Sequence, residues 1–152
     1  MTTPPAVFTQ FGQTLAFAER TLTAVLRERL AERGTRPETW YVFQLVSSRG
    51  PDFSREALIS DLAGSPGLDA ASASELLARL EAEGLVTGDS HVELTAEGDE
   101  LYRGLREHVF AGTARLLGQF DIRDIETTVS TMRAITQRAA EERAEQLAAS
   151  DR

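Results

Sequence analysis

The stretch from residue 53 to residue 98 constrains the fold most strongly, because helix caps, apolar helical repeats and chain breakers alternate within it. Ser54 is placed to cap a helix, since its side-chain oxygen can accept a free N–H of the first turn. Asp69 is placed to cap a second helix, after a break rich in glycine and proline at residues 64–67. Apolar residues recur at helical spacing on both segments, namely Leu58, Ile59 and Leu62, then Ala73, Leu76, Leu77 and Leu80. The pattern predicts two short helices packed close together.

The residues after this helix pair predict a small antiparallel sheet. Gly84 ends the second helix at the position where a left-handed backbone favours glycine. Residues 85–86 and 91–94 then read as two short strands around a tight turn at Gly88-Asp89. Thr95 is placed to cap a long third helix that runs to Gly118. Helix, turn, helix and two-stranded wing is the order of a winged helix-turn-helix.

This lobe resembles the DNA-binding lobe of the MarR family of bacterial transcriptional regulators. The matching words are LISDLA at residues 58–63, LLARLEAEGLV at 76–86 and LTAEGDEL at 94–101. In the family the corresponding segments typically have the sequence patterns xELA, xxRLExxGLV and LTxxG. The resemblance implies a mainly α fold with a single domain over residues 1–152. In that fold the winged lobe covers about residues 37–98, and dimerisation helices cover about 7–33 and 99–148.

Two apolar seams lie at opposite ends of the chain. The first is Phe8, Phe11, Leu15, Ala18, Leu22 and Val25, and the second is Ile122, Ile125, Val129, Met132 and Ile135. Asp121 is placed to cap the helix that carries the second seam, and the polar tail of that helix is expected to fray or extend into solvent. Each seam fits an ordinary core stripe or a helix that packs on a second chain. The resemblance favours the second interpretation and implies a homodimer.

Aromatic residues are densest on the helix that Pro37 begins, at Trp40, Tyr41 and Phe43. Such density usually indicates core. In the family this helix also lines a pocket for a small aromatic or anionic effector, and Trp40 and Tyr41 each carry a polar tip that can orient a ligand. The ligand-binding residues that the resemblance implies are Trp40, Tyr41, Phe43, Arg106 and His108.

Charge bears directly on the expected binding of duplex DNA, because basic side chains replace counterions on phosphates. The chain carries a net charge of −8, and residues 53–95 hold two arginines against eight acidic residues. Aligned on the family pattern, the exposed start of the second helix of the lobe, its recognition helix, is Ala70, Ala71, Ser72, Ser74 and Glu75. The expected DNA-binding residues are Ser72, Ser74 and Glu75 of this face, with Arg55 and Arg79 as the two arginines of residues 53–95. Family wings are typically longer and carry an Asp-x-Arg motif, which residues 87–90 lack.

Other functional classes find little support in the sequence. Cysteine is absent, so a disulfide or a thiolate metal site is excluded. His91 and His108 are the two histidines, and neither has the spacing of a zinc site. We therefore expect no catalytic residues, no metal and no cofactor. We also expect no membrane partner, because no apolar run is long enough to span a bilayer. The N-terminus shows no secretory signal, which favours a cytoplasmic protein.

Two functional hypotheses follow from these observations. The first is a dimeric DNA-binding regulator that responds to a small-molecule effector. The second is a protein of the same fold that has lost DNA binding. It would bind a small molecule, with or without an enzymatic step, or would bind a basic protein partner through its acidic lobe.

Overall fold

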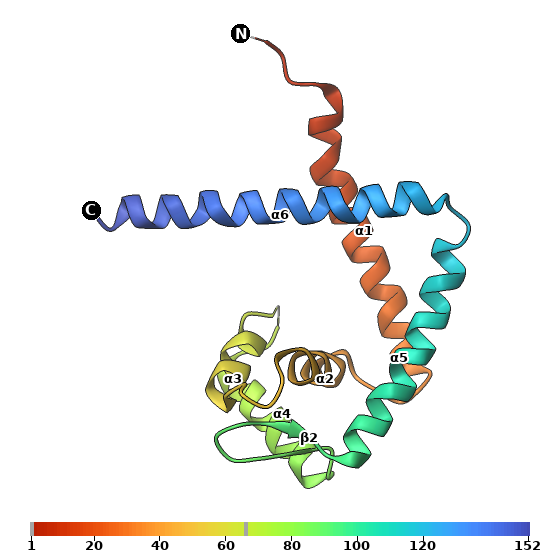
Figure 1. Cartoon of the computed structure of the whole chain (residues 1–152), viewed down its shortest axis with the longest axis vertical. Coiled ribbons are helices and arrows are strands. Elements are labelled where there is room, and N and C mark those ends of the chain that lie inside the picture. The colour runs from red at the N-terminus through yellow and green to blue at the C-terminus, as the bar shows by residue number, and fades with distance from the viewer. Residues whose placement is uncertain (1, 66) are drawn as a thin grey trace. The chain divides into compact units, whose positions relative to one another are not determined.

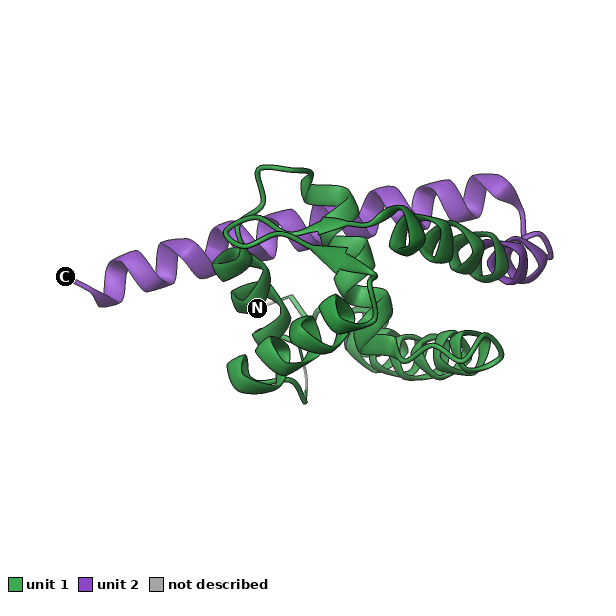
Figure 2. Ribbon diagram, turned by 90° about the horizontal axis from the view of Figure 1, so that it is seen from below, with its two compact units in different colours: residues 1–109 green, residues 110–152 purple. Residues whose placement is uncertain are grey.

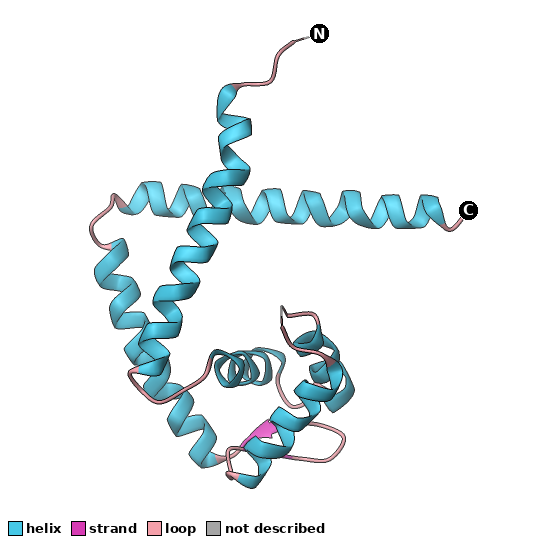
Figure 3. Cartoon of the chain, turned by 180° about the vertical axis from the view of Figure 1, so that it is seen from behind, coloured by secondary structure: helices cyan, strands magenta, loops and turns pink. Residues whose placement is uncertain are grey.

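A computed structural model describes residues 2–65 and 67–152. Within these residues the chain forms helices and one two-stranded antiparallel sheet (Figures 1 and 3). The elements are α1 (Ala6–Ala31), α2 (Pro37–Arg49), α3 (Arg55–Ala63), α4 (Ala70–Ala82), β1 (Val86–Thr87), β2 (Glu93–Leu94), α5 (Ala96–Leu117) and α6 (Ile122–Ser150). No helix in the described part of the chain has the length and apolar character needed to cross a membrane.

The chain divides into two compact units (Figure 2). The first covers residues 1–109 and holds α1, the winged lobe and most of α5. The second covers residues 110–152 and holds the end of α5 together with α6. The predicted lobe therefore lies wholly inside the first unit.

The core of the lobe is built from the apolar stripes that the sequence predicted. The buried members of this cluster are Val42, Val46, Phe53, Leu58, Leu62, Ala73, Leu76, Leu77, Leu80, Val86 and Val92. They come from α2, α3, α4 and the wing, and Ile59 packs against them half-buried. Burial of these side chains fixes which face of α4 points inward and which face stays in solvent.

A second apolar cluster joins α1, α2 and α5 within the first unit. It contains Leu30, Trp40, Phe43, Tyr102 and Leu105. The Tyr102 ring lies 5.4 Å from the Trp40 ring and 5.8 Å from the Phe43 ring, measured between centroids. Tilted aromatic contacts of this kind add to the free energy of burial. The start of α5 is therefore held firmly against α2.

The four predicted helix caps are confirmed. Ser54 Oγ accepts the N–H of Ala57 at 3.1 Å, and Thr95 Oγ1 accepts the N–H of Gly98 at 3.0 Å. The carboxylates of Asp69 and Asp121 accept backbone N–H groups at 2.7 and 2.8 Å. The polar C-terminal tail continues as regular helix to Ser150.

The wing differs from the prediction. The strands pair Val86 with Leu94 and Thr87 with Glu93, so residues 88–92 connect them and the expected tight turn is wrong. The cause is contact with α3, since His91 forms an isolated bridge with Ser54 and the Ser90 carbonyl accepts the Arg55 N–H at 2.9 Å. Residues 90–91 therefore leave the hairpin to lie at the start of α3.

Candidate functional site

Helix α4, the second helix of the predicted helix pair, presents one face to solvent. Ala70, Ala71, Ser74 and Glu75 are exposed at its first turns, whereas Ser72 is half-buried. Asp69 caps this end, and hydrogen bonds from the backbone and the hydroxyl of Ser72 lower the pKa of its carboxyl. The exposed face thus offers a hydroxyl and a carboxylate, the groups that the sequence placed there.

Arg55 is held inside the lobe. Its Nε donates to the Asp89 carbonyl at 3.0 Å, and its Nη2 donates to the Gly88 carbonyl at 3.2 Å. The same guanidinium forms an ion pair with Glu81 of α4. Its side chain is 27% exposed. These contacts, called the Arg55 network below, join the start of α3 to the wing and to α4.

Arg79 lies on the rim of a surface groove of about 720 Å³ between α2 and α4. Its Nε lies 3.9 Å from Glu83 Oε1, one turn along the helix. Arg36, the residue before α2, lines the same groove together with Ser72 and Glu75. The structure thus brings a second arginine, from outside residues 53–95, to the face that carries Ser72, Glu75 and Arg79.

The wing tip carries no arginine, and its shape depends on Gly88. This residue has φ +114°, and a Cβ atom built on it would overlap the His91 carbonyl. Only glycine fits such a position without strain. Asp89, Ser90 and His91 are exposed around it, with Ser90 Oγ 3.0 Å from His91 Nδ1. The tip therefore presents polar and acidic groups.

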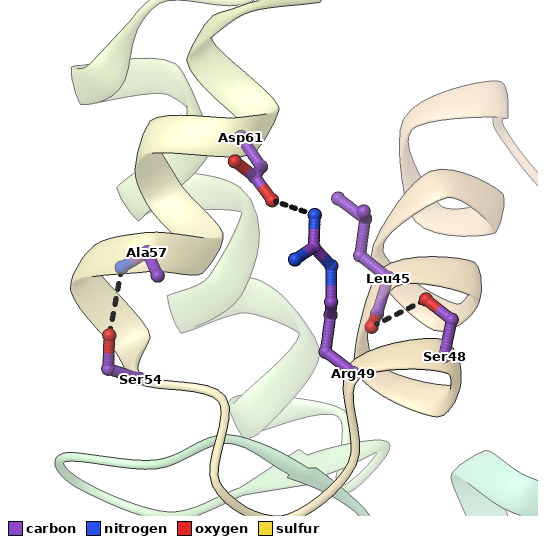
Figure 4. A network of polar contacts seen from close by, with 6 residues as sticks. All are labelled: Leu45, Ser48, Arg49, Ser54, Ala57 and Asp61. Carbon is purple, nitrogen blue, oxygen red and sulfur yellow. Dashed lines mark hydrogen bonds and ion pairs between the residues drawn. The ribbon is translucent and has the colours of Figure 1, made fainter. Parts of the chain in front are cut away.

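Helices α2 and α3 are linked at the surface by an ion pair (Figure 4). Arg49 Nη2 lies 3.3 Å from Asp61 Oδ2, and the guanidinium also stacks over the Phe53 ring at 5.4 Å. Figure 4 shows the Ser54 cap at the start of α3 beside this pair. Arg49 therefore serves the packing of the lobe.

The five predicted ligand-binding residues have different surroundings in the described part of the chain. Trp40 and Phe43 are buried in the second apolar cluster. Tyr41 is half-buried and lines a separate hollow. His108 Nε2 lies 2.7 Å from Glu32 Oε2 and joins α5 to the end of α1. Arg106 lines a different cavity.

That cavity lies between the end of α2, strand β2 and the first turns of α5, with a volume of about 400 Å³. Among its lining residues are Ser47, Glu93, Asp99, Tyr102, Arg103 and Arg106. Sequence reasoning found only Arg106 of these. The signal was available, because residues 99, 102, 103 and 106 share one face of a helix at three- and four-residue steps.

Comparison with known proteins shows which known fold this chain shares. No protein-family model and no curated protein sequence matches the chain. Among solved structures, a MarR family protein from Bacillus stearothermophilus has a TM-score of 0.74 at 18% identity, covering 91% of this chain and 99% of that one. Staphylococcus aureus MarR in complex with salicylate and kanamycin has a TM-score of 0.73 at 15% identity, covering 90% and 94%. This chain has the MarR fold.

CouR from Rhodococcus jostii bound to p-coumaroyl-CoA shares the MarR fold with this chain, at a TM-score of 0.66 and 20% identity. The match covers 87% of this chain and 95% of CouR. In the MarR fold of the present chain, α3 and α4 form the helix-turn-helix and β1–β2 the wing. The predicted fold class is confirmed by these structures.

Proposed function

We propose that this chain is a dimeric DNA-binding transcriptional regulator that responds to a small-molecule effector. The observation that carries the proposal is the two-faced recognition helix α4. One face supplies Leu76, Leu77 and Leu80 to the core, and the other leaves Ser74 and Glu75 in solvent. A helix in this position of a helix-turn-helix reads base edges in the major groove with its N-terminal residues.

The DNA contacts of the proposal are few. Ser72 and Ser74 would donate to phosphate or a base edge, and Glu75 would accept from a cytosine amino group. Arg79 and Arg36 would face the phosphates from the groove between α2 and α4. Arg55 would reach DNA only by leaving the Arg55 network. We therefore expect DNA binding that depends weakly on salt.

Dimerisation is supported by apolar side chains exposed on the outer helices. On α1 the exposed residues are Val7, Phe8, Phe11, Leu15, Phe17 and Leu22, and α6 exposes Ile122, Val129, Ile135 and Leu147. Helix α6 has no buried residue. Large apolar side chains repeated along an exposed helix cost free energy in water, and a large exposed apolar patch often marks an interaction surface. A second copy of the chain would cover it.

Effector binding is proposed for a small aromatic or anionic molecule near α2 and α5. Trp40 and Phe43 pack with Tyr102 in one apolar cluster, and Arg106 lines an open cavity together with Tyr102. Tyr41 of α2 and His108 of α5 lie in the same unit but do not line this cavity. A regulator of this kind acts on the chromosome, so we place it in the cytoplasm.

A second function is favoured by the charge of the lobe. The Arg55 guanidinium is paired with Glu81, and Arg79 stands beside Glu83. The two arginines of residues 53–95 are thus both close to carboxylates. The same fold without DNA affinity would then bind a metabolite or use its acidic lobe for a basic protein partner.

Fluorescence anisotropy with labelled duplexes from the DNA flanking the reading frame separates these two functions. For the regulator we expect saturable binding to one such duplex and about tenfold or more weaker binding to a scrambled duplex of the same composition. Arg79→Ala should abolish the preference. Arg49→Ala, which removes a packing arginine of the same lobe, should retain it. A folded dimer that binds none of the flanking duplexes would support the second function.

A further inference from the structure

The wing depends on α3 for its position. Its two strands are two residues long each, and an isolated two-stranded hairpin is at best marginally stable in water. The Arg55 backbone N–H donates to the Ser90 carbonyl at 2.9 Å. The Arg55 side chain donates to the carbonyls of Asp89 and Gly88 at 3.0 and 3.2 Å. One residue thus binds three successive carbonyls of the wing, and the wing can leave α3 only by breaking all three hydrogen bonds.

The same side chain reaches the recognition helix. Arg55 Nη2 forms an ion pair with Glu81 Oε1, in the last turn of α4. The planar fork of a guanidinium can bind wing carbonyls and a carboxylate at the same time, which the point charge of an ammonium cannot. We propose that Arg55 is a positioning residue, which does not touch DNA and instead fixes the wing relative to α4. Wing and helix would then meet a duplex as one surface. This inference rests on the proposed DNA binding.

The charges around Arg55 disfavour a phosphate at its guanidinium. Glu81 is in ion-pair contact with it, and the next residue on α3 is Glu56, whose side chain is exposed. Asp89, whose carbonyl accepts from Arg55, also carries an exposed carboxylate. A phosphate at Arg55 would be repelled by these acidic groups and would have to replace Glu81 or a wing carbonyl. Arg55 is therefore better paired inside the lobe than with DNA.

A fixed wing matters because the lobe has few groups with which to contact DNA. The start of α4 exposes Ser74 and Glu75, and the wing tip exposes Asp89 and Ser90. A segment that is ordered only on binding lowers the affinity by the entropy that it loses, whereas a segment held beforehand does not. Loss of Arg55 should therefore weaken DNA binding through the position of the wing, with no phosphate contact removed.

Fluorescence anisotropy with the best-binding flanking duplex, repeated over a range of salt concentrations, tests this role. We expect Arg55→Gln to weaken binding about three- to tenfold and to leave the salt slope unchanged. Arg55→Lys should weaken binding as much, since lysine keeps the charge but lacks the fork. A phosphate contact would give the reverse and overturn the inference. Arg55→Lys would then bind like the original chain, and Arg55→Gln would have a slope shallower by about two units per dimer.

Glu81→Gln provides a test in which the two roles of Arg55 predict opposite signs. Glu56→Gln is the charge-matched control, because it also removes one negative charge from the lobe, whereas Glu81 is the residue in contact with Arg55. If Arg55 positions the wing, Glu81→Gln should bind DNA more weakly than Glu56→Gln does. Tighter binding by Glu81→Gln than by Glu56→Gln would show that the freed Arg55 contacts DNA, and would overturn the inference.

Hydrogen exchange of the wing amides without DNA separates failure of this inference from failure of the regulator. Glu81→Gln should raise exchange within residues 86–94 about three- to tenfold, and Glu56→Gln less than about twofold. The variant with both Arg55→Gln and Glu81→Gln should stay within about twofold of Arg55→Gln alone, because Glu81 acts through Arg55. This dependence in a chain that binds no flanking duplex would refute the regulator and support the coupling of wing to α4. Additive effects of the two substitutions would overturn the coupling, even in a chain that binds DNA.

Discussion

The Arg55 network gives the sharpest expectation about the lobe, because one side chain joins three elements. Arg55→Ala removes two hydrogen bonds to wing carbonyls, at 3.0 and 3.2 Å, and the ion pair with Glu81. Hydrogen bonds from a charged donor contribute about 1.5–3 kcal/mol each when buried. Since the side chain is 27% exposed, solvent screening reduces the total. We expect the free energy of wing opening to fall by about 2 kcal/mol.

Native-state hydrogen exchange measures this quantity directly. A loss of about 2 kcal/mol raises the exchange rate of wing amides about thirtyfold. We expect that increase within residues 86–94, and little change for the amides of α2. Arg103→Ala is the matched control, because it removes an exposed ion pair with Asp99. It should change the free energy of wing opening by less than about 0.5 kcal/mol. Unchanged protection of the wing in Arg55→Ala would refute the structural role given to this arginine.

Three further expectations concern assembly, the aromatic cluster and helix capping. Light scattering should give twice the chain mass of 16.6 kDa, and Leu15→Glu should yield a monomer, whereas a clean monomer from the original chain would contradict the dimer. Trp40→Ala should destabilise the fold by about 3–5 kcal/mol in chemical denaturation, because Trp40 is 5% exposed, and a loss below about 1 kcal/mol would contradict its place in the core. Hydrogen bonds from Ser72 lower the pKa of Asp69 below its usual 3.8, so the stability that its ionised form contributes is present above pH 3.8 and lost as pH falls through the folded-state pKa. Asp69→Asn should retain the cap and lose that pH dependence, and identical acid melting profiles of the two proteins would contradict it.

Features that depend on neighbouring residues were predictable from the sequence. The caps at Ser54, Asp69 and Asp121 lie within three residues of the groups they bond, so local spacing suffices to find them. The same holds for the apolar stripes of α3 and α4, whose periodicity determines the buried face. The fold of the lobe follows from these local signals in their order along the chain.

Features that depend on distant residues were not predictable. Arg55 meets the carbonyls of Gly88 and Asp89 across more than thirty residues, and His108 meets Glu32 across 76. No local pattern indicates such partners, so Arg55 was expected at the DNA as one of the two arginines of residues 53–95. The wing connection was misjudged for the same reason, since α3 rather than the hairpin holds residues 90–91. The ligand cavity needed the placement of β2 against α5.

The salt dependence of binding to the best flanking duplex tests the central claim most directly. With Arg79 and Arg36 as the cations at the groove, we expect log affinity to fall with log salt at a slope of about −2 to −4 per dimer, one unit for each phosphate neutralised. Glu75→Arg should strengthen binding to any duplex and steepen the slope, because it replaces a repelling carboxylate with a phosphate contact. A slope near −8 from the original chain would show that DNA meets another, more basic surface. Absence of binding at every salt concentration, with the dimer intact, would contradict the regulator itself.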